Sequence, residues 1–203
     1  MQSENALDRY FPYGLAAAFS VFWVALAINP VMRDVWWAEN LPIIGVFLLL
    51  LLTYRIFKFS NLAYGLMAVW MILHTIGGHY TFANVPFDFF TDLFGHERNH
   101  FDRLGHYSIG FYAFPIAELL TRKRLAKPTV VYLFSLFAIM ALAAGYEIIE
   151  WWYAAMAGGD AGIEFLGSQG DIWDAQKDML ADTLGAITAL ILFRFATIRP
   201  ENG

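Results

Sequence analysis

Six long apolar segments dominate this chain and limit the folds that it can adopt. They cover residues 12–31, 41–58, 61–80, 104–121, 129–152 and 176–196. Each is about as long as the roughly 17–25 residues that an α-helix needs to cross the hydrocarbon core of a bilayer. Backbone in lipid must satisfy its own hydrogen bonds, so apolar segments of this length form helices. The sequence therefore predicts an all-α integral membrane protein, one domain of six transmembrane helices over residues 1–203.

The basic residues predict the orientation of these helices. If the N-terminus is cytoplasmic, nine of the 13 Lys and Arg residues fall on the inner side, five of them outside the run TRKRLAKP at 121–128. The four on the outer side are Arg33, Arg98, Arg103 and Lys177. Cytoplasmic loops carry an excess of Lys and Arg, so we expect both termini to be cytoplasmic.

Composition excludes several classes of function. The chain is 59 % hydrophobic with 15 % charged residues, whereas a soluble domain has about 25 % charged residues. A net charge of −5 without a basic arm argues against nucleic-acid binding. The absence of cysteine excludes disulfides, thiolate zinc sites and thiol nucleophiles. Membrane lipids are the expected surroundings.

The segments and loops differ in polarity. Segments 12–31 and 41–58 carry almost no polar groups, so we expect them to face lipid. The outer loop 81–103 mixes aromatic, acidic and histidine residues, as in an interfacial segment. The glycine-rich outer loop 153–173 could be a lid over the bundle or an ordinary connector. Six glycines are expected to allow close helix packing, namely Gly77, Gly78, Gly105, Gly110, Gly145 and Gly185.

Acidic and histidine side chains gather at the outer ends of four expected helices. Helical spacing of three or four residues puts the members of each group on one face, and at about 1.5 Å per residue the groups reach a similar depth. These groups are His74 and His79; Asp102 and His106; Glu147 and Glu150; and Asp171, Asp174, Asp178 and Asp182. Ionisable groups at membrane depth indicate a functional site.

These carboxylates need compensation if they are buried. Protonation, ion pairs with Arg103 or Lys177, or a bound cation can supply it, and two basic residues are too few for seven acids. Mixed imidazole and carboxylate ligands favour Mn, Fe or Zn, and an all-oxygen subset favours Mg or Ca. Alternatively, some acids are solvated, and Asp171 or Asp174 caps the last helix. The candidate metal ligands are His106, Glu147, Glu150, Asp178 and Asp182.

The strings GGHYTFANVPFDFF, ERNHFDRLGHYSIGF, YEIIEWW and LGSQGDIWDAQKDM resemble the YjdF-like family of predicted bacterial inner-membrane proteins, a domain of unknown function. The resemblance covers residues 60–195. It implies the six-helix fold and an inner-membrane location, and it implies no activity. The matching polar positions are His79, Tyr80, Asn99, Asp102, Arg103, His106, Glu147, Glu150, Gly170, Asp171, Trp173, Asp174, Gln176 and Asp178.

A looser similarity links the chain to VanZ-like membrane proteins, whose pattern is D-x-x-x-H, E-x-x-Q and D-x-x-x-N-x-x-G. The pattern would fall on Asp102 and His106, Glu147 and Glu150, and Asp178, Asp182 and Gly185. Glutamate replaces glutamine at position 150 and aspartate replaces asparagine at position 182. Both departures add acid, which favours a cation. VanZ-like proteins are linked to glycopeptide tolerance, which hints at cell-envelope chemistry.

Three functions fit these features. The first is a metal-dependent enzyme acting on a lipid or lipid-linked envelope substrate at the outer leaflet. The second is a proton- or cation-coupled transporter, and the third is a non-catalytic membrane module. In the enzyme, His106, Asp102 and His79 are the candidate catalytic residues, with Asp102 orienting His106. The supporting residues are His74, Arg103, Trp173, Asp174 and Gln176.

Overall fold

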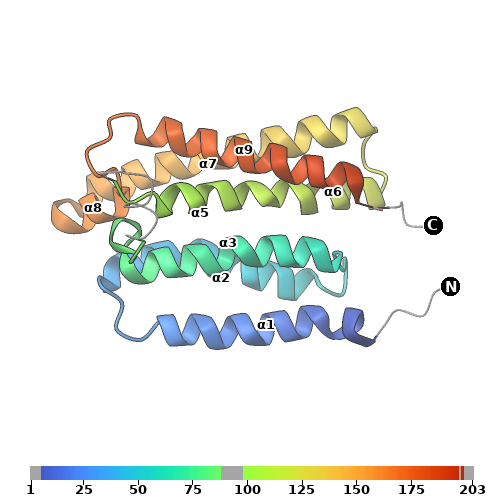
Figure 1. Ribbon diagram of the computed structural model, residues 1–203, viewed down its shortest axis with the longest axis horizontal. Helices are drawn as coiled ribbons and strands as arrows, with labels where there is room; N and C mark the ends of the chain where they lie inside the picture. The colour runs from blue at the N-terminus through green and yellow to red at the C-terminus, as the bar shows by residue number, and fades with distance from the viewer. Residues whose placement is uncertain (1–5, 88–97, 197, 199–203) are drawn as a thin grey trace.

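The computed structural model describes residues 6–87, 98–196 and 198, and in these residues the regular elements are all helices. The prediction of an all-α fold is therefore confirmed. The long helices run side by side along one direction (Figure 1). In chain order the elements are α1 (Ala6–Leu26), α2 (Arg33–Thr53), α3 (Asn61–Tyr80), η1 (Phe82–Asn84), α5 (Phe101–Ile109), η2 (Gly110–Tyr112), α6 (Ala113–Arg122), α7 (Pro128–Ala157), α8 (Gly159–Leu166) and α9 (Asp174–Phe195).

Two of the described helices, α2 and α7, are long and apolar enough to cross a membrane by length and composition. In their apolar windows only 28 % and 22 % of the residues are buried. A core helix of a soluble protein is mostly buried, so the outward-facing apolar side chains of these two helices favour a lipid environment.

The expected segment 104–121 is divided into α5, η2 and α6, which follow one another along nearly one line (Figure 1). Pro115 explains the division. A proline inside a helix removes one hydrogen bond and its ring collides with the carbonyl group four residues earlier, here that of Phe111. Phe111 lies in the 3-10 turn η2, where the chain tightens to avoid this collision.

The glycine-rich segment 153–173 is more ordered than a loop. The helix α7 continues to Ala157, and α8 follows between Gly158 and Gly167, which have φ angles of 62° and 61°. Glycine adopts this left-handed backbone region at little cost and commonly ends helices there. The other expected outer loop, 81–103, lies partly outside the described residues.

The core sits around α9, which packs against α5, η2, α6 and α7. Its buried apolar cluster includes Phe114 on α6, Ile139 on α7, and Ala186 and Ala189 on α9. The helix α1 packs on α3 at the periphery. The side chains on α9 are therefore held against α5 and α7.

Two glycines allow α9 to approach α5 and η2 closely. A Cβ atom on Gly185 would overlap the carbonyl oxygen of Tyr107, and one on Gly110 would overlap the backbone of α9. Gly77, Gly78 and Gly105 also face close neighbours, whereas a Cβ on Gly145 would meet nothing within 4 Å. The expectation of close packing was therefore wrong for Gly145, because this residue faces open space on α7.

Candidate functional site

The acidic and histidine residues gather at one end of the bundle, where α2, α5 and α9 begin and α3 ends. We call this the acidic end; it is the left end of the bundle in Figure 1. Most of the expected residues are buried there, which places them in a low-dielectric interior rather than in a solvated rim. The buried ones are His74, Asp102, His106, Glu150, Asp174, Asp178 and Asp182.

His106 on α5 lies between three carboxylates. Its Nδ1 atom is hydrogen-bonded to Oδ2 of Asp182 at 3.2 Å. Its Nε2 atom lies 3.6 Å from Oδ1 of Asp102 and 3.8 Å from Oδ1 of Asp178. The residue that orients the ring is therefore Asp182 on α9, rather than Asp102 as expected from the sequence. A carboxylate that holds one ring nitrogen is typical of histidines that act as metal ligands or bases through the other.

Asp102, His106 and Asp178 could together hold a metal ion. One ligand atom from each lies within 4.8 Å of the other two, and all three residues are buried. The neighbouring Asp182 has a buried Oδ1 atom without a hydrogen-bond partner among the described residues. A buried carboxylate oxygen needs a partner, so the donor set fits a cation at this place.

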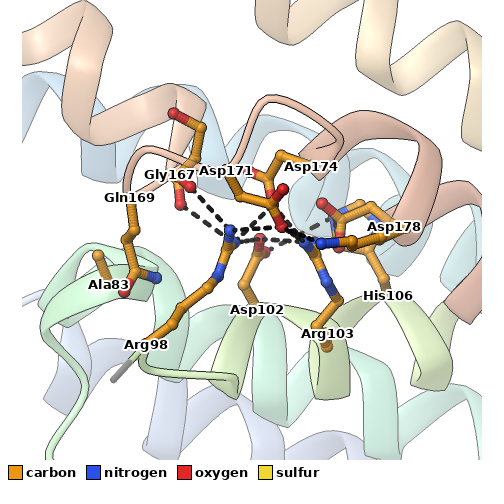
Figure 2. Close-up of polar contacts among 12 residues, drawn as sticks. Ala83, Arg98, Asp102, Arg103, His106, Gly167, Gln169, Asp171, Asp174 and Asp178 are labelled. Carbon is orange, nitrogen blue, oxygen red and sulfur yellow. Dashed lines mark hydrogen bonds and ion pairs between the residues drawn. The ribbon is translucent and has the colours of Figure 1, made fainter. Parts of the chain in front are cut away.

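Two arginines offset the acids on the α9 side, and Figure 2 shows their guanidinium groups among carboxylates. Arg98 approaches Oδ1 of Asp174 with its Nη2 atom at 2.6 Å. Arg103 donates to the same oxygen and also contacts Oδ1 of Asp178. The prediction that Arg103 and Lys177 are the basic partners therefore omitted Arg98, and fewer acids lack a basic partner than we expected.

Asp171 does not cap α9. The N-cap position of α9 is Trp173, without a side-chain cap, and Asp174 is already inside the helix. Asp171 instead accepts hydrogen bonds from the Trp173 backbone N–H at 3.1 Å and from Lys177 at 2.6 Å. The Lys177 ammonium group lowers the pKa of the Asp171 carboxyl group. The helix α9 begins at Asp174, three residues after Asp171, so Asp171 lies too early in the chain to be its N-cap.

A second group of polar residues was missed from the sequence. Glu39 on α2 is buried; its Oε2 atom accepts a hydrogen bond from the Tyr146 hydroxyl group at 2.9 Å and lies 3.1 Å from Nε2 of His74. Glu39 lies in the first part of α2, just before the segment 41–58 that we expected to face lipid, so that prediction did not include it. The adjacent polar pair Glu39 and Asn40, set between apolar residues, was the available signal.

A cavity of about 230 Å³ lies beside His106. At the acidic end its walls carry polar side chains, and towards the middle of the bundle they are apolar. The polar lining residues are Glu39, His74, Asp102, His106, Tyr146, Glu150 and Asp182, with Tyr112 among the apolar walls. Asp102 and His106 thus face an amphipathic cavity, a common form of small-molecule site, whereas Asp178 is not part of its lining.

Several expected residues do not join this group. The Nδ1 atom of His79 lies 2.8 Å from the carbonyl oxygen of Leu26, on the side of α3 that faces α1. Trp173 is 60 % exposed and Gln176 is also exposed. Glu147 is half-buried and is not part of the cavity lining, but its Oε1 atom is buried without a hydrogen-bond partner among the described residues. The roles of His79, Trp173 and Gln176 gain no contact with this group, and the role of Glu147 as a metal ligand stays a prediction.

The end of α8 and the residue after it form part of the cavity wall, through Phe165, Leu166 and Gly167. The segment that follows is tied to residues 98 and 99. Arg98 donates to the carbonyl oxygen of Ser168 at 2.7 Å. Asn99 and Gln169 exchange two hydrogen bonds, of 3.1 and 3.0 Å, between backbone and side chain. These contacts hold the segment against residues 98 and 99. The lid and the connector both stay predictions.

Removing the Arg98 side chain should loosen the segment that follows α8. We expect Arg98→Ala to speed hydrogen exchange of the backbone amides of residues 167–172 in the detergent-purified protein, because their tie to the α5 side is lost. The matched control is Lys177→Ala, which removes an exposed ion pair with Asp171 from the same loop. Equal exchange in both variants would show that Arg98 does not hold this segment.

The helical fold with buried acidic and histidine side chains and outward apolar faces defines a membrane protein of the helical class. The chain belongs to the family described as "Predicted membrane protein (DUF2238)", which matches residues 11–199. It is 40 % identical over 164 residues to "Inner membrane protein YjdF" of Escherichia coli (strain K12), and the alignment covers 79 % of this chain and 78 % of that relative. No solved structure matches.

These findings confirm the resemblance to the YjdF-like family that the sequence strings suggested. The looser similarity to VanZ-like proteins stays a prediction. Neither the family description nor the name of the relative states an activity, so the function has to be argued from the cavity and its side chains.

Proposed function

We propose that this chain is a multi-pass protein of the bacterial inner membrane, with six spans and both termini in the cytoplasm. In this proposal α5, η2 and α6 together form the fourth span. The excess of basic residues at one end and the inner-membrane location of the relative support it. The start of α1 and the end of α9 lie at the same end of the bundle, opposite the acidic end (Figure 1). The acidic end then faces the outside.

Within this topology, we propose a metal-dependent enzyme that acts on a lipid or lipid-linked envelope substrate at the outer leaflet. The observation that carries the proposal is His106, fixed by Asp182 through Nδ1 while its Nε2 atom faces Asp102 and Asp178 beside the cavity. Asp102, His106 and Asp178 would hold a divalent Mn, Fe, Zn or Mg ion. The ion would polarise a phosphoryl or ester oxygen or lower the pKa of a bound water.

The surrounding side chains position this group. Asp182 keeps the His106 ring in one orientation, since a hydrogen-bonded imidazole loses its freedom to rotate. Arg103 contacts the Oδ1 atom of Asp178 and helps to hold this carboxylate in place. Glu39, hydrogen-bonded to Tyr146 and paired with His74, forms the facing wall, where it can bind polar groups of a substrate.

Elemental analysis of the purified protein tests the proposal. We expect about one Mn, Fe, Zn or Mg ion per chain in a preparation never exposed to a chelator. His106→Ala should lose the ion, since it removes the nitrogen ligand. Asp160→Asn, which changes an exposed carboxylate on α8, should retain it.

Wild-type protein without stoichiometric metal would refute the metal site. In the non-catalytic alternative, the polar residues only hold the helices in register. A His106→Ala variant that lacks metal but unfolds at the wild-type temperature would contradict this alternative and support a functional role for His106.

The packing gives less support to a transporter. Between the level of Asp182 and the opposite end, the described interior is built from apolar residues such as Phe114, Ile139 and Ala186. The next buried carboxylate, Glu118, is fully engaged: it accepts hydrogen bonds from the Ser60 backbone and hydroxyl groups at 2.8 and 2.7 Å and from Arg122 at 2.7 Å. We therefore favour chemistry at one face over passage through the bundle.

A further inference from the structure

The cavity beside His106 has one half with polar side chains, which Phe82, Phe165 and Leu166 also line, and one half without charged side chains. One half carries the carboxylates and imidazoles of the acidic end. The other half is lined by Val46 on α2, Trp70 on α3, Tyr112 on η2 and Ile139 on α7. An apolar lining stabilises an apolar ligand by removing both surfaces from water. A ligand that fills both halves is therefore an amphiphile.

The length of the cavity matches half of a bilayer. Its lining on α7 runs from Glu150 at the acidic end to Ile139, eleven residues further in. At about 1.5 Å per residue this is roughly 16 Å. A hydrocarbon core is about 30 Å thick, so one leaflet is about 15 Å. In the proposed topology the cavity reaches from the outer surface to the middle of the membrane.

Two aromatic residues, Trp70 and Tyr112, line the inner end of the cavity. The rings of Trp70 and Tyr112 meet edge to face with centroids 5.4 Å apart. The Tyr112 hydroxyl group donates to the carbonyl oxygen of Met67 at 3.3 Å. Buried aromatic rings held in this way have little freedom to move. They form a floor that limits how much chain can enter.

One side of the cavity reaches the lipid-facing surface. The helix α2 packs on α3 and α8, and α7 packs on α6, α8 and α9. Near the acidic end α2 and α7 are joined by the hydrogen bond from Tyr146 to Glu39. Deeper in the bundle, Val46 and Leu142 line the cavity from these two helices, and Leu142 is also 59 % exposed on the outer surface. The side chains between α2 and α7 thus line the cavity on one side and face lipid on the other.

We propose that the cavity takes a hydrocarbon chain of an outer-leaflet lipid, which enters sideways between α2 and α7 and leaves its polar head at the acidic end. The buried Oδ1 atom of Asp182, which has no partner among the described residues, lies where that head would sit. The inference rests on the proposed topology and names the substrate class of the proposed enzyme, a lipid with a chain short enough to end at Trp70.

Trp70 provides a built-in probe for the chain. It is 5 % exposed and lines the cavity, so an acyl chain in the cavity brings its bromine atoms closer to the indole ring than surrounding lipid does. We would reconstitute the protein in vesicles of phosphatidylcholine, with and without bromine on the chains. The Trp70 contribution is the emission of the wild type minus that of Trp70→Phe. We expect bromine to remove more than half of this contribution.

A matched pair of variants tests the route. Ala143→Phe fills the cavity, whereas Ala141→Phe makes the same change on an exposed face of α7 outside the cavity lining. We expect Ala143→Phe to protect Trp70 from bromine and Ala141→Phe to leave the loss unchanged. Val46→Phe narrows the cavity from α2 and replaces Ala143→Phe if that variant does not fold.

Unchanged Trp70 emission in brominated vesicles would overturn the inference, as would equal quenching in the filled and control variants. The readout needs neither metal nor turnover. Quenching of Trp70 in a protein without metal would support the proposed lipid chain and contradict the proposed metal site. Bound metal without quenching would support the metal site and contradict the lipid chain.

Discussion

Replacing Arg103 by methionine is expected to lower the free energy of unfolding by about 3–5 kcal/mol, because it leaves buried carboxylates without their counter-charge. The guanidinium group contacts Asp174 and Asp178, both buried in the first turns of α9. Arg98 still compensates Asp174, so the loss falls mainly on Asp178. Thermal unfolding of the detergent-purified protein, followed by size-exclusion chromatography, measures the effect.

A second substitution identifies the cause. Arg103→Met combined with Asp178→Asn should recover part of the lost stability, since the carboxylate that needed compensation is gone. The control is Lys177→Met, which removes an ion pair whose lysine side chain is 52 % exposed; such exposed pairs contribute about 0–1 kcal/mol. If the Arg103 and Lys177 variants unfold alike, the buried network contributes no more than a surface pair.

Gly185→Ala should cost about 1–3 kcal/mol, the usual effect of forcing extra atoms into a packed interior. The added Cβ atom would overlap the backbone of Tyr107, which cannot rotate away as a side chain can. The α5 and α9 helices would have to separate, and with them His106 and Asp182, which lie on the same two helices. We therefore expect a lower unfolding temperature together with a lower metal content.

Gly145→Ala is the matched control for this substitution. Gly145 also lies inside a long helix, but a Cβ atom there meets nothing within 4 Å. Alanine in a helix is favoured over glycine by roughly 0.5–1 kcal/mol, so this variant should unfold at or above the wild-type temperature. Equal destabilisation by both substitutions would show that close contact between α5 and α9 is not what Gly185 provides.

Much of the architecture could be predicted because long apolar segments leave a chain few alternatives to helices. The sequence also placed His74, Asp102, His106, Asp178 and Asp182 at one end of the bundle, since helical spacing and chain direction determine depth. Periodicity says little about which helices become neighbours. The pairing of His106 with Asp182 depends on the close approach of α5 and α9, and helix packing of this kind is a tertiary property.

The residues that the sequence did not reveal share one property, which is that their partners are distant in the chain. Glu39 could not be recognised as part of the group because its partner Tyr146 lies 107 residues later in the chain. Arg98 was treated as a loop residue because its contact with Ser168 spans 70 residues. His79 illustrates the opposite error: it has the right depth on α3 but faces α1. Depth was predictable, whereas the direction around each helix was not.

The ion network of the acidic end has a consequence for the synthesis of the protein. The partners of Arg103 and His106 on α9 are encoded 71 and 76 residues after them. During translation α5 therefore leaves the ribosome long before Asp174 and Asp182 exist, and unpaired charges are costly inside a bilayer. We expect the nascent α5 to stay at the insertion machinery or at the membrane surface until α9 has been made. The last helix to be synthesised would then be needed for the earlier helix α5 to enter the bundle.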